Sequence, residues 1–352
     1  MKIGKAILAG IGVILLALSI GIASDSDTES RENSLRVAFF PNIGHAIPVV
    51  GMEKGFFEEN LGNKTTIDPK LFDSGPQVIE SLFANSIDIA YVGPGPAING
   101  FLKSEHHDVV ILSGAASGGA SFNVSLRNYL SENGLKPFEK GGEVVVLNIP
   151  NPDIYTLFTK GEIDGAWVPE PWATILVQEL DGNRLFFEED LWPEKQFASV
   201  LLIGRLQYVE THPEIISDWL ESHQQTANWI NNNPQETRII FNEFMENHMG
   251  QSLSDSVVDE ALVNLKITTD PIDESVYEFA KAAGFEPEYV PFKGGLHFGA
   301  PGHHRIPVGV SSSTRRLWAA SLPFLSAASP QRPAVVRSLV TCTCASRCCR
   351  RA

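Results

Sequence analysis

The sequence predicts an α/β protein of two lobes, with doubly wound parallel sheets and a helical C-terminal part. The first observation is an internal repeat: residues 87–97 read Ile-Asp-Ile-Ala-Tyr-Val-Gly-Pro-Gly-Pro-Ala, and residues 163–173 read Ile-Asp-Gly-Ala-Trp-Val-Pro-Glu-Pro-Trp-Ala. Each copy is interpreted as a turn, a short buried strand and a Pro-marked helix start. The second observation is an alternation of strand-like and helix-like segments, and the third is a purely helical pattern from Thr211 onward. Two copies of one α/β unit predict two lobes with a cleft between them.

Composition narrows the class of protein. The chain has 352 residues, enough for two domains, with 43% hydrophobic and 20% charged residues. A formal net charge of −15 argues against a nucleic-acid partner. The four cysteines all lie near the C-terminus, at Cys342, Cys344, Cys348 and Cys349. The rest of the chain therefore has no disulfide, no thiol nucleophile and no cysteine metal site.

The N-terminus resembles an export signal. Lys2 and Lys5 precede an apolar run over residues 6–23, and a polar linker over residues 24–34 follows. This order of charge, apolar core and small-residue exit is typical of a secretory signal, and the length of the run also permits an uncleaved membrane anchor. We expect an exported protein, periplasmic or extracytoplasmic, either cleaved or anchored by residues 6–23.

The first lobe is expected over residues 35–122. Apolar, β-favouring segments predict strands at residues 35–40, 65–72, 87–92 and 109–113. Helices are expected between them, at residues 46–60, from the segment 73–77 to residue 85, and at residues 93–103. Ser74 is the expected N-cap of the second helix, with Pro76 in its first turn. A loop of small residues is predicted over residues 113–121.

The second lobe is expected over residues 123–200. Helices are predicted at residues 125–133, 152–160 and 171–180, and Gly134 ends the first of them. Strands are predicted at residues 143–149, in the second copy of the repeat, and at residues 184–187. A strongly apolar strand over residues 197–203 leads out of this lobe.

The chain then returns to the first lobe over residues 201–283, which are helical. Thr211 is the expected cap of a helix with Pro213 in its first turn, and Asn233 is expected to open a capping box on a helix that ends at Gly250. Two further helices are expected at residues 254–265 and 275–283. The periodicity fails after Gly284, so residues 284–352 are interpreted as a disordered basic tail unrelated to the fold, such as a frameshifted reading would produce.

Four motifs carry a resemblance to a known family. They are Val-Ala-Phe-Phe-Pro-Asn-Ile-Gly-His at residues 37–45, Gly-Met-Glu-Lys-Gly-Phe-Phe-Glu at residues 51–58, and the two copies of the repeat. In this order they resemble the nitrate/sulfonate/taurine group of ABC-transporter substrate-binding proteins. The resemblance implies a two-lobe, periplasmic-binding-protein-like (type II) fold that closes on a small solute and delivers it to a membrane permease.

The sequence departs from that family at one internal position. Relatives carry a longer stretch between Phe122 and Leu126, with a hinge continuation, a further strand and a loop that helps to hold the ligand. About one βα unit is missing here. The resemblance therefore leaves open a truncated relative that keeps the fold without binding solute.

Ligands of open α/β sheets bind beyond the carboxyl ends of the strands, at helix N-termini. The candidate ligand-binding residues at these ends are Asn42, His45, Ser74, Gln77, Gly93, Gly95, Ser117, Ser121, Trp167, Glu170 and Trp172. These loops contain no Arg or Lys, so neutral donors and helix N–H groups would hold a sulfonate, nitrate or carboxylate.

Glu170, between Trp167 and Trp172, adds a carboxylate beside aromatic faces, which suits an ammonium group. Together with the anion donors it would suit a zwitterion such as an aminosulfonate. Each of these residues also has a structural alternative: Trp167 as core, Glu170 as a partner of the helix start, and His45 as a structural histidine. Asp88 and Asp164 precede the two repeat strands and are expected to fix turns.

Solute binding is the function that the sequence favours. No catalytic triad, phosphate loop or zinc spacing is present, so no catalytic residue, cofactor or metal is assigned. The expected partners are a small solute and an ABC permease, with the protein itself a monomer. The alternative is an enzyme on the same fold, similar to thiamine-pyrimidine synthases, although those use a Cys-rich motif that residues 1–341 lack.

Overall fold

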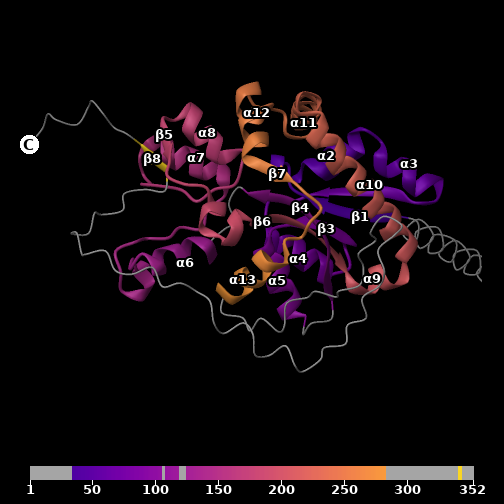
Figure 1. The fold of residues 1–352 in the computed structure, drawn as a ribbon, viewed down its shortest axis with the longest axis horizontal. Helices are drawn as coiled ribbons and strands as arrows, with labels where there is room; N and C mark the ends of the chain where they lie inside the picture. The colour runs from indigo at the N-terminus through magenta and orange to yellow at the C-terminus, as the bar shows by residue number, and fades with distance from the viewer. Residues whose placement is uncertain (1–33, 105–107, 119–123, 283–339, 343–352) are drawn as a thin grey trace, which may run out of the picture.

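The computed structural model describes residues 34–104, 108–118, 124–282 and 340–342. A six-stranded sheet crosses the middle of the molecule, with helices on both faces (Figure 1). Its strands are β1 (Ser34–Phe39), β2 (Thr66–Leu71), β3 (Ile89–Val92), β4 (Val109–Gly118), β6 (Ala198–Arg205) and β7 (Leu265–Ile267). The order across the sheet is β2-β1-β3-β6-β4-β7. The α/β class is confirmed.

The first three strands follow the expected pattern. β1 pairs in parallel with β2 and with β3, and the connecting segments cover the sheet. These segments are η1 (Ile43–His45), α2 (Ala46–Glu53), α3 (Phe56–Leu61), η2 (Gly62–Lys64), α4 (Gly75–Phe83) and α5 (Pro94–Lys103). The single helix predicted over residues 46–60 is broken at Gly55, which has a φ of 72° and separates α2 from α3.

The other half of the sheet is antiparallel, which the prediction of parallel sheets missed. β6 lies between β3 and β4 and runs antiparallel to both, and β7 adds a further antiparallel edge. A second error concerns the predicted small-residue loop. β4 runs on through Ser113 to Gly118 with register irregularities, because small side chains fit a strand that is buried between β6 and β7.

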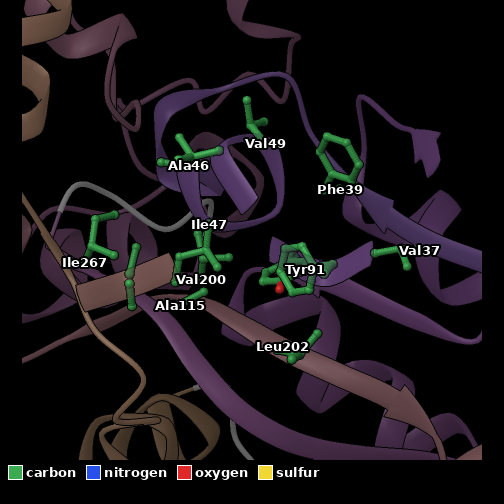
Figure 2. Packing of buried hydrophobic residues seen from close by; sticks show 14 of the residues in the cluster. Val37, Phe39, Ala46, Ile47, Val49, Tyr91, Ala115, Val200, Leu202 and Ile267 are labelled. Atoms are coloured by element: carbon green, nitrogen blue, oxygen red, sulfur yellow. The ribbon is translucent and has the colours of Figure 1, made fainter. Parts of the chain in front are cut away.

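Side chains alternate between the two faces of the sheet and build two cores. Val37 and Phe39 of β1, with Val200 and Leu202 of β6, face α2, α3 and the long C-terminal helices (Figure 2). Ala38 and the other alternate positions face α4 and α5 instead. Full burial of such apolar side chains stabilises the fold by roughly 1.5–3 kcal/mol each.

The C-terminal part is helical, as predicted, with different caps. It contains α9 (Leu206–Thr211), α10 (Pro213–Asn232), α11 (Pro234–Met249), α12 (Asp255–Asn264) and α13 (Asp273–Ala282). Thr211 ends α9, and His212 occupies the N-cap of α10. Asn233 is the N-cap of α11, but its side chain donates to the carbonyl oxygen of Trp229 and forms no capping box. Ser254 caps α12 through its side chain.

A third, smaller core defines a second unit beside the sheet. Ile154 and Phe158 pack there against Val168 and Leu176. Its helices are α6 (Val124–Glu132), η3 (Phe138–Lys140), α7 (Asn151–Lys160), α8 (Trp172–Glu179), η4 (Glu188–Leu191) and η5 (Pro193–Lys195). Figure 1 places α6, α7 and α8 together on one side of the sheet.

The second unit differs most from the prediction. Neither residues 143–149 nor residues 163–169 form a strand, although both were predicted as strands. An extended segment becomes a strand only where a neighbour accepts its hydrogen bonds, and Val144 has only an isolated bridge to Pro137. The strand in this unit is β5 (Gly182–Arg184), shifted from the predicted residues 184–187, and it pairs with β8 (Val340–Cys342).

Several expectations lie outside the described residues. They are the export signal, the linker before Ser34 and nearly all of the basic tail. No helix within the described ranges is long and apolar enough to cross a membrane. The limits of the two lobes stay predictions.

Candidate functional site

The carboxyl ends of β1, β2 and β3 lie at one edge of the sheet, and the segments that follow them form one half of the candidate site. η1 follows β1, α4 follows β2, and α5 follows β3. The starts of α4 and α5 touch, because a Cβ on Gly75 would lie 2.3 Å from Cγ of Pro96. The sequence prediction that these strand ends converge is consistent with the parallel pairing of the three strands.

The two adjacent helix starts offer a small set of backbone donors. The first three residues of α4 are Gly-Pro-Gln, and those of α5 are Pro-Gly-Pro. Since proline has no N–H, the backbone donors are those of Gly75, Gln77 and Gly95. Such first-turn N–H groups have no acceptor within their own helix. Ser74 occupies the N-cap of α4, but its side chain makes no capping hydrogen bond. The hydroxyl of Ser74 therefore does not compete for these N–H groups.

β6 adds a hydroxyl that the sequence analysis missed. The Oγ atom of Ser199 is buried and has no hydrogen-bond partner within the described part of the chain. The carbonyl oxygen of Ser199 lies 3.6 Å from the position that a Cβ on Gly93 would take, so Ser199 is beside the start of α5. A buried hydroxyl without a partner is uncommon and calls for an explanation, and a bound molecule would supply one.

Ser117 and Ser121 were predicted from the small-residue loop. Ser117 instead lies in β4, opposite Ala198 and Lys266, and is 5% exposed. Because Ala198 precedes Ser199 in the sequence, Ser117 lies near the same edge of the sheet as Ser199. Ser121 lies outside the described residues.

His45 and Asn42 follow β1 in η1. His45 is 2% exposed, and its Nδ1 accepts a 3.3 Å hydrogen bond from the backbone N–H of Phe40. Burial lowers the pKa of His45 to about 3, so the ring is neutral and brings no positive charge to an anion. Asn42 is half-buried, and its side chain makes no capping bond to η1. Asn42 is thus the more accessible of the two.

Trp167 belongs to an aromatic cluster in the second unit. Its ring centroid lies 5.8 Å from that of Tyr129 and 5.6 Å from that of Phe186. Its indole N–H donates to the carboxylate of the buried Glu188 over 2.7 Å. The half-buried ring therefore joins α6 to the segment after β5, which is the core role considered as an alternative for this residue.

Glu170 is 1% exposed and surrounded by donors of the protein itself. Its Oε1 accepts from Arg184 over 2.8 Å and from Asn264 over 2.9 Å, and its Oε2 accepts from the backbone N–H of Thr174 over 3.1 Å. The contact with Thr174 matches the predicted support of the helix start. Binding of an ammonium group by this carboxylate would require these partners to be displaced.

Trp172 is the first residue of α8 and packs half-buried against the third core. Each of the three predicted residues thus has partners within the protein itself. Trp167 binds Glu188, Glu170 binds Arg184, and Trp172 covers apolar side chains. Their roles as ligand-binding residues stay predictions.

The two aspartates of the repeat differ. Asp88 is fully buried and accepts hydrogen bonds from Arg36 and Arg205, so it ties β1 to the end of β6. Asp164 is exposed and lies in a bend. The identical residues at identical repeat positions thus have different environments, because only the first copy lies in a sheet.

An acidic side chain of η4 lies beside the end of β4. Glu189 lies so close to Gly118 that a Cβ on this glycine would be 2.8 Å from its Oε2. Burial, with a smaller contribution from Asp190, raises the pKa of Glu189. Within the described ranges, no group of three or more His, Cys, Asp or Glu side chains could hold a metal ion. Arg184, Glu188 and Asn264 were missed because their partners are distant in sequence.

The mixed sheet, its flanking helices and the attached second unit define an α/β protein of the periplasmic-binding-protein fold. Its structure is similar to that of the alkanesulfonate-binding protein SsuA of Xanthomonas axonopodis pv. citri, with a TM-score of 0.56 at 15% identity over 74% of this chain and 96% of that one. The chain belongs to the NMT1-like family, whose model matches residues 28–126 and 101–242.

Two curated relatives are more similar in sequence. A protein of Brucella abortus named as a binding protein is 24% identical over 256 residues, which cover 66% of this chain and 78% of the relative. The taurine-binding periplasmic protein of Escherichia coli K12 is 24% identical over 182 residues, which cover 45% of this chain and 55% of the relative. Both are named as binding proteins, in agreement with the resemblance found in the sequence.

Proposed function

We propose that the protein is an exported solute-binding component of an ABC importer that captures a small anion or zwitterion. An aliphatic sulfonate, taurine or nitrate is the class of solute that suits the donors at the sheet edge. One observation carries the proposal: the uncapped starts of α4 and α5 touch beside the buried, unpartnered hydroxyl of Ser199.

The chemistry of this edge favours an anion with several acceptor oxygens. The N–H groups of Gly75, Gln77 and Gly95 carry the partial positive charge of helix starts. The hydroxyls of Ser74 and Ser199 add neutral donors. A site built from neutral donors holds an oxyanion without an arginine, which suits a solute that must later be released to a permease. The names of the SsuA and taurine-binding relatives support this class of solute.

Calorimetric titration of the full chain with taurine, methanesulfonate, nitrate and bicarbonate tests the proposal. The decisive variant is Ser199→Ala, since the hydroxyl has no partner and its loss should not lower thermal stability. Affinity for the bound solute should fall about tenfold or more, as expected when a hydrogen bond to a charged group is lost. Ser252→Ala, at an exposed serine between α11 and α12, is the matched control. A folded protein that binds none of the four solutes would overturn the proposal.

The second candidate function is a relative that keeps the fold without binding. Its motivation is the second unit, where residues 143–149 and 163–169 form no strands. The family model also matches the chain in two pieces, residues 28–126 and 101–242, which overlap over residues 101–126. The missing βα unit inferred from the sequence lies at the end of this overlap. Insertion of a relative's segment between Val124 and Ser125 should then create solute affinity that the natural chain lacks. An enzyme on this fold has no comparable supporting observation.

Export and partnership belong to the same proposal. Residues 1–23 would direct export by a cleaved signal or by an anchor, and the folded protein would meet its permease as a monomer. Fractionation of cells that express the full chain distinguishes these routes, because a cleaved product is shorter and leaves with the soluble extracytoplasmic fraction. Recovery of the full-length chain in the cytoplasm would contradict export.

A further inference from the structure

The second unit is connected to the sheet unit in two ways, by the chain that crosses between them and by a contact between two helices. The chain leaves the sheet at the end of β4 and returns at the start of β6, where the backbone N–H of Gly118 donates to the carbonyl oxygen of Phe197 over 3.1 Å. In addition to this crossing, α8 of the second unit contacts α12 of the sheet unit. Figure 1 shows α12 between α8 and α11.

The centre of the α8–α12 contact is the carboxylate of Glu170. Its charge is balanced by Arg184, at 2.8 Å, and Arg184 also lies over the ring of Phe187 with 4.6 Å between the guanidinium carbon and the ring centroid. Thr174 binds the other carboxylate oxygen through its backbone N–H. Arg184 and Thr174 both belong to the second unit, so the carboxylate of Glu170 keeps two partners there even when α12 moves away.

Asn264 is the partner of Glu170 that comes from the sheet unit. Its Nδ2 lies 2.9 Å from Oε1 of Glu170 and 3.3 Å from Oγ1 of Thr174. Asn264 ends α12 and directly precedes β7, which pairs with β4 up to Gly118. A Cβ on Gly118 would lie 3.0 Å from the carbonyl oxygen of Asn264. The contact therefore stands next to the place where the chain crosses between the units.

A second hydrogen-bonded point lies nearer the start of α12. The side chain of Gln178, on α8, accepts from the hydroxyl of Ser256 over 3.0 Å and donates to the carboxylate of Glu260. Gln178 is exposed, whereas Glu170 is buried. The two points together align α8 along α12, with the buried one near the crossing and the exposed one at the rim.

We propose that Asn264 is a positioning residue: its contact with Glu170 is a clasp between the units that sets how often the second unit opens away from the sheet. On the α12 side the clasp consists of the neutral Asn264, and in the second unit Glu170 is paired with Arg184. The clasp can therefore break while the carboxylate of Glu170 stays paired with Arg184. This inference rests on the proposed function only where it links opening to solute capture. The clasp itself is defined without any solute.

The first test compares Asn264→Ala with Asn231→Ala in the full chain without solute. Asn231 also donates one side-chain hydrogen bond, to the carbonyl oxygen of Ile267, but within the sheet unit. Hydrogen exchange should become about tenfold or more faster in α8 and α12 of Asn264→Ala, as expected for the loss of a hydrogen bond to a carboxylate. Small-angle scattering should detect a larger radius of gyration for Asn264→Ala than for the control.

A stronger variant is Asn264→Asp, which places a second carboxylate against Glu170. Repulsion should open the clasp further than the alanine variant does, while far-ultraviolet circular dichroism stays unchanged. Equal exchange rates and equal radii in the Asn264 variants and in Asn231→Ala would overturn the clasp. That result would leave the proposed solute binding untouched. Conversely, if the Asn264 variants behave as expected but the protein binds no solute, the clasp stands and the proposed function fails.

Discussion

The hydroxyl of Tyr91 lies 2.9 Å from Nδ1 of His223 in the middle of the larger core. The Nε2 atom of His223 lies 2.8 Å from the carbonyl oxygen of Gly114, which can only accept, so Nε2 carries the proton. Nδ1 of the neutral ring then accepts from Tyr91, whose oxygen in turn accepts from the indole N–H of Trp219 over 3.2 Å. This chain of hydrogen bonds joins β3, β4 and α10.

The neutral state of the two buried histidines makes stability depend on pH. Burial lowers the pKa of His223 to about 4 and that of His45 to about 3, against 6.5 for an ordinary histidine. Below pH 6.5 the unfolded chain binds more protons than the folded one, so the stability present above this pH is lost as the pH falls. Each histidine should contribute a slope of up to about 1.4 kcal/mol per pH unit.

Urea unfolding at several pH values between about 7.5 and about 5 measures this slope. His223→Gln should unfold at lower urea overall, but with a weaker pH dependence than the natural chain. A stability that stays flat between these pH values would contradict the neutral, buried assignment of both rings.

Removal of one hydroxyl tests the same network. Tyr91→Phe leaves the indole N–H of Trp219 and Nδ1 of His223 without a partner, and both side chains are at most 1% exposed. We expect a loss of about 1–3 kcal/mol for each buried group left unpaired. Tyr277→Phe, at a tyrosine that is 40% exposed, is the control and should change the unfolding free energy by less than about 0.5 kcal/mol. Equal stabilities of the two variants would disprove the network.

The internal repeat supplies a matched pair of aspartate variants. Asp88→Asn places an amide N–H₂ among the donors of Arg36 and Arg205 and removes the charge that balances them. Loss of one partner of a buried ion pair costs about 3–5 kcal/mol. Asp164→Asn, at the same repeat position but exposed, should cost less than about 0.5 kcal/mol. Chemical denaturation of both variants would refute this difference if the two midpoints moved equally.

The contrast between these aspartates also explains which part of the fold the sequence could predict. Strands β1, β2 and β3 and most helices follow from local patterns, because apolar runs and helix periodicity are properties of neighbouring residues. The position of β6 between β3 and β4 could not be predicted in this way, because it depends on pairs such as Ser117 with Ala198 and Ile89 with Gly204, which are far apart in the sequence. The second copy of the repeat has the pattern of a strand but no neighbouring strand to complete it.

The candidate site was predictable to the same degree. The helix starts at Ser74 and Gly93 follow from Pro and Gly positions, so the edge of the sheet that we propose as the anion site could be located. The hydrogen-bond partners of Glu170 could not be predicted in full, because Asn264 lies 94 residues away in the sequence. Ser199 was missed because the sequence shows only a serine within an apolar strand. Its buried hydroxyl without a hydrogen-bond partner is a property of the folded structure.

The unpaired segment of the second unit gives the last prediction. Residues 145–149 have no regular secondary structure, and Val145 and Leu147 are 64% and 55% exposed although the sequence is that of a buried strand. Since the described part of the chain provides no strand beside them, backbone amides of residues 145–149 should exchange with solvent nearly as fast as in an unfolded peptide. Amides of β3, paired on both sides, should be protected by several orders of magnitude in rate. Insertion of a relative's segment after Val124 should slow exchange at residues 145–149 and leave β3 unchanged. Strong protection of residues 145–149 in the natural chain would contradict the unpaired state, and its dependence on protein concentration would then distinguish pairing with a second copy from pairing within one molecule.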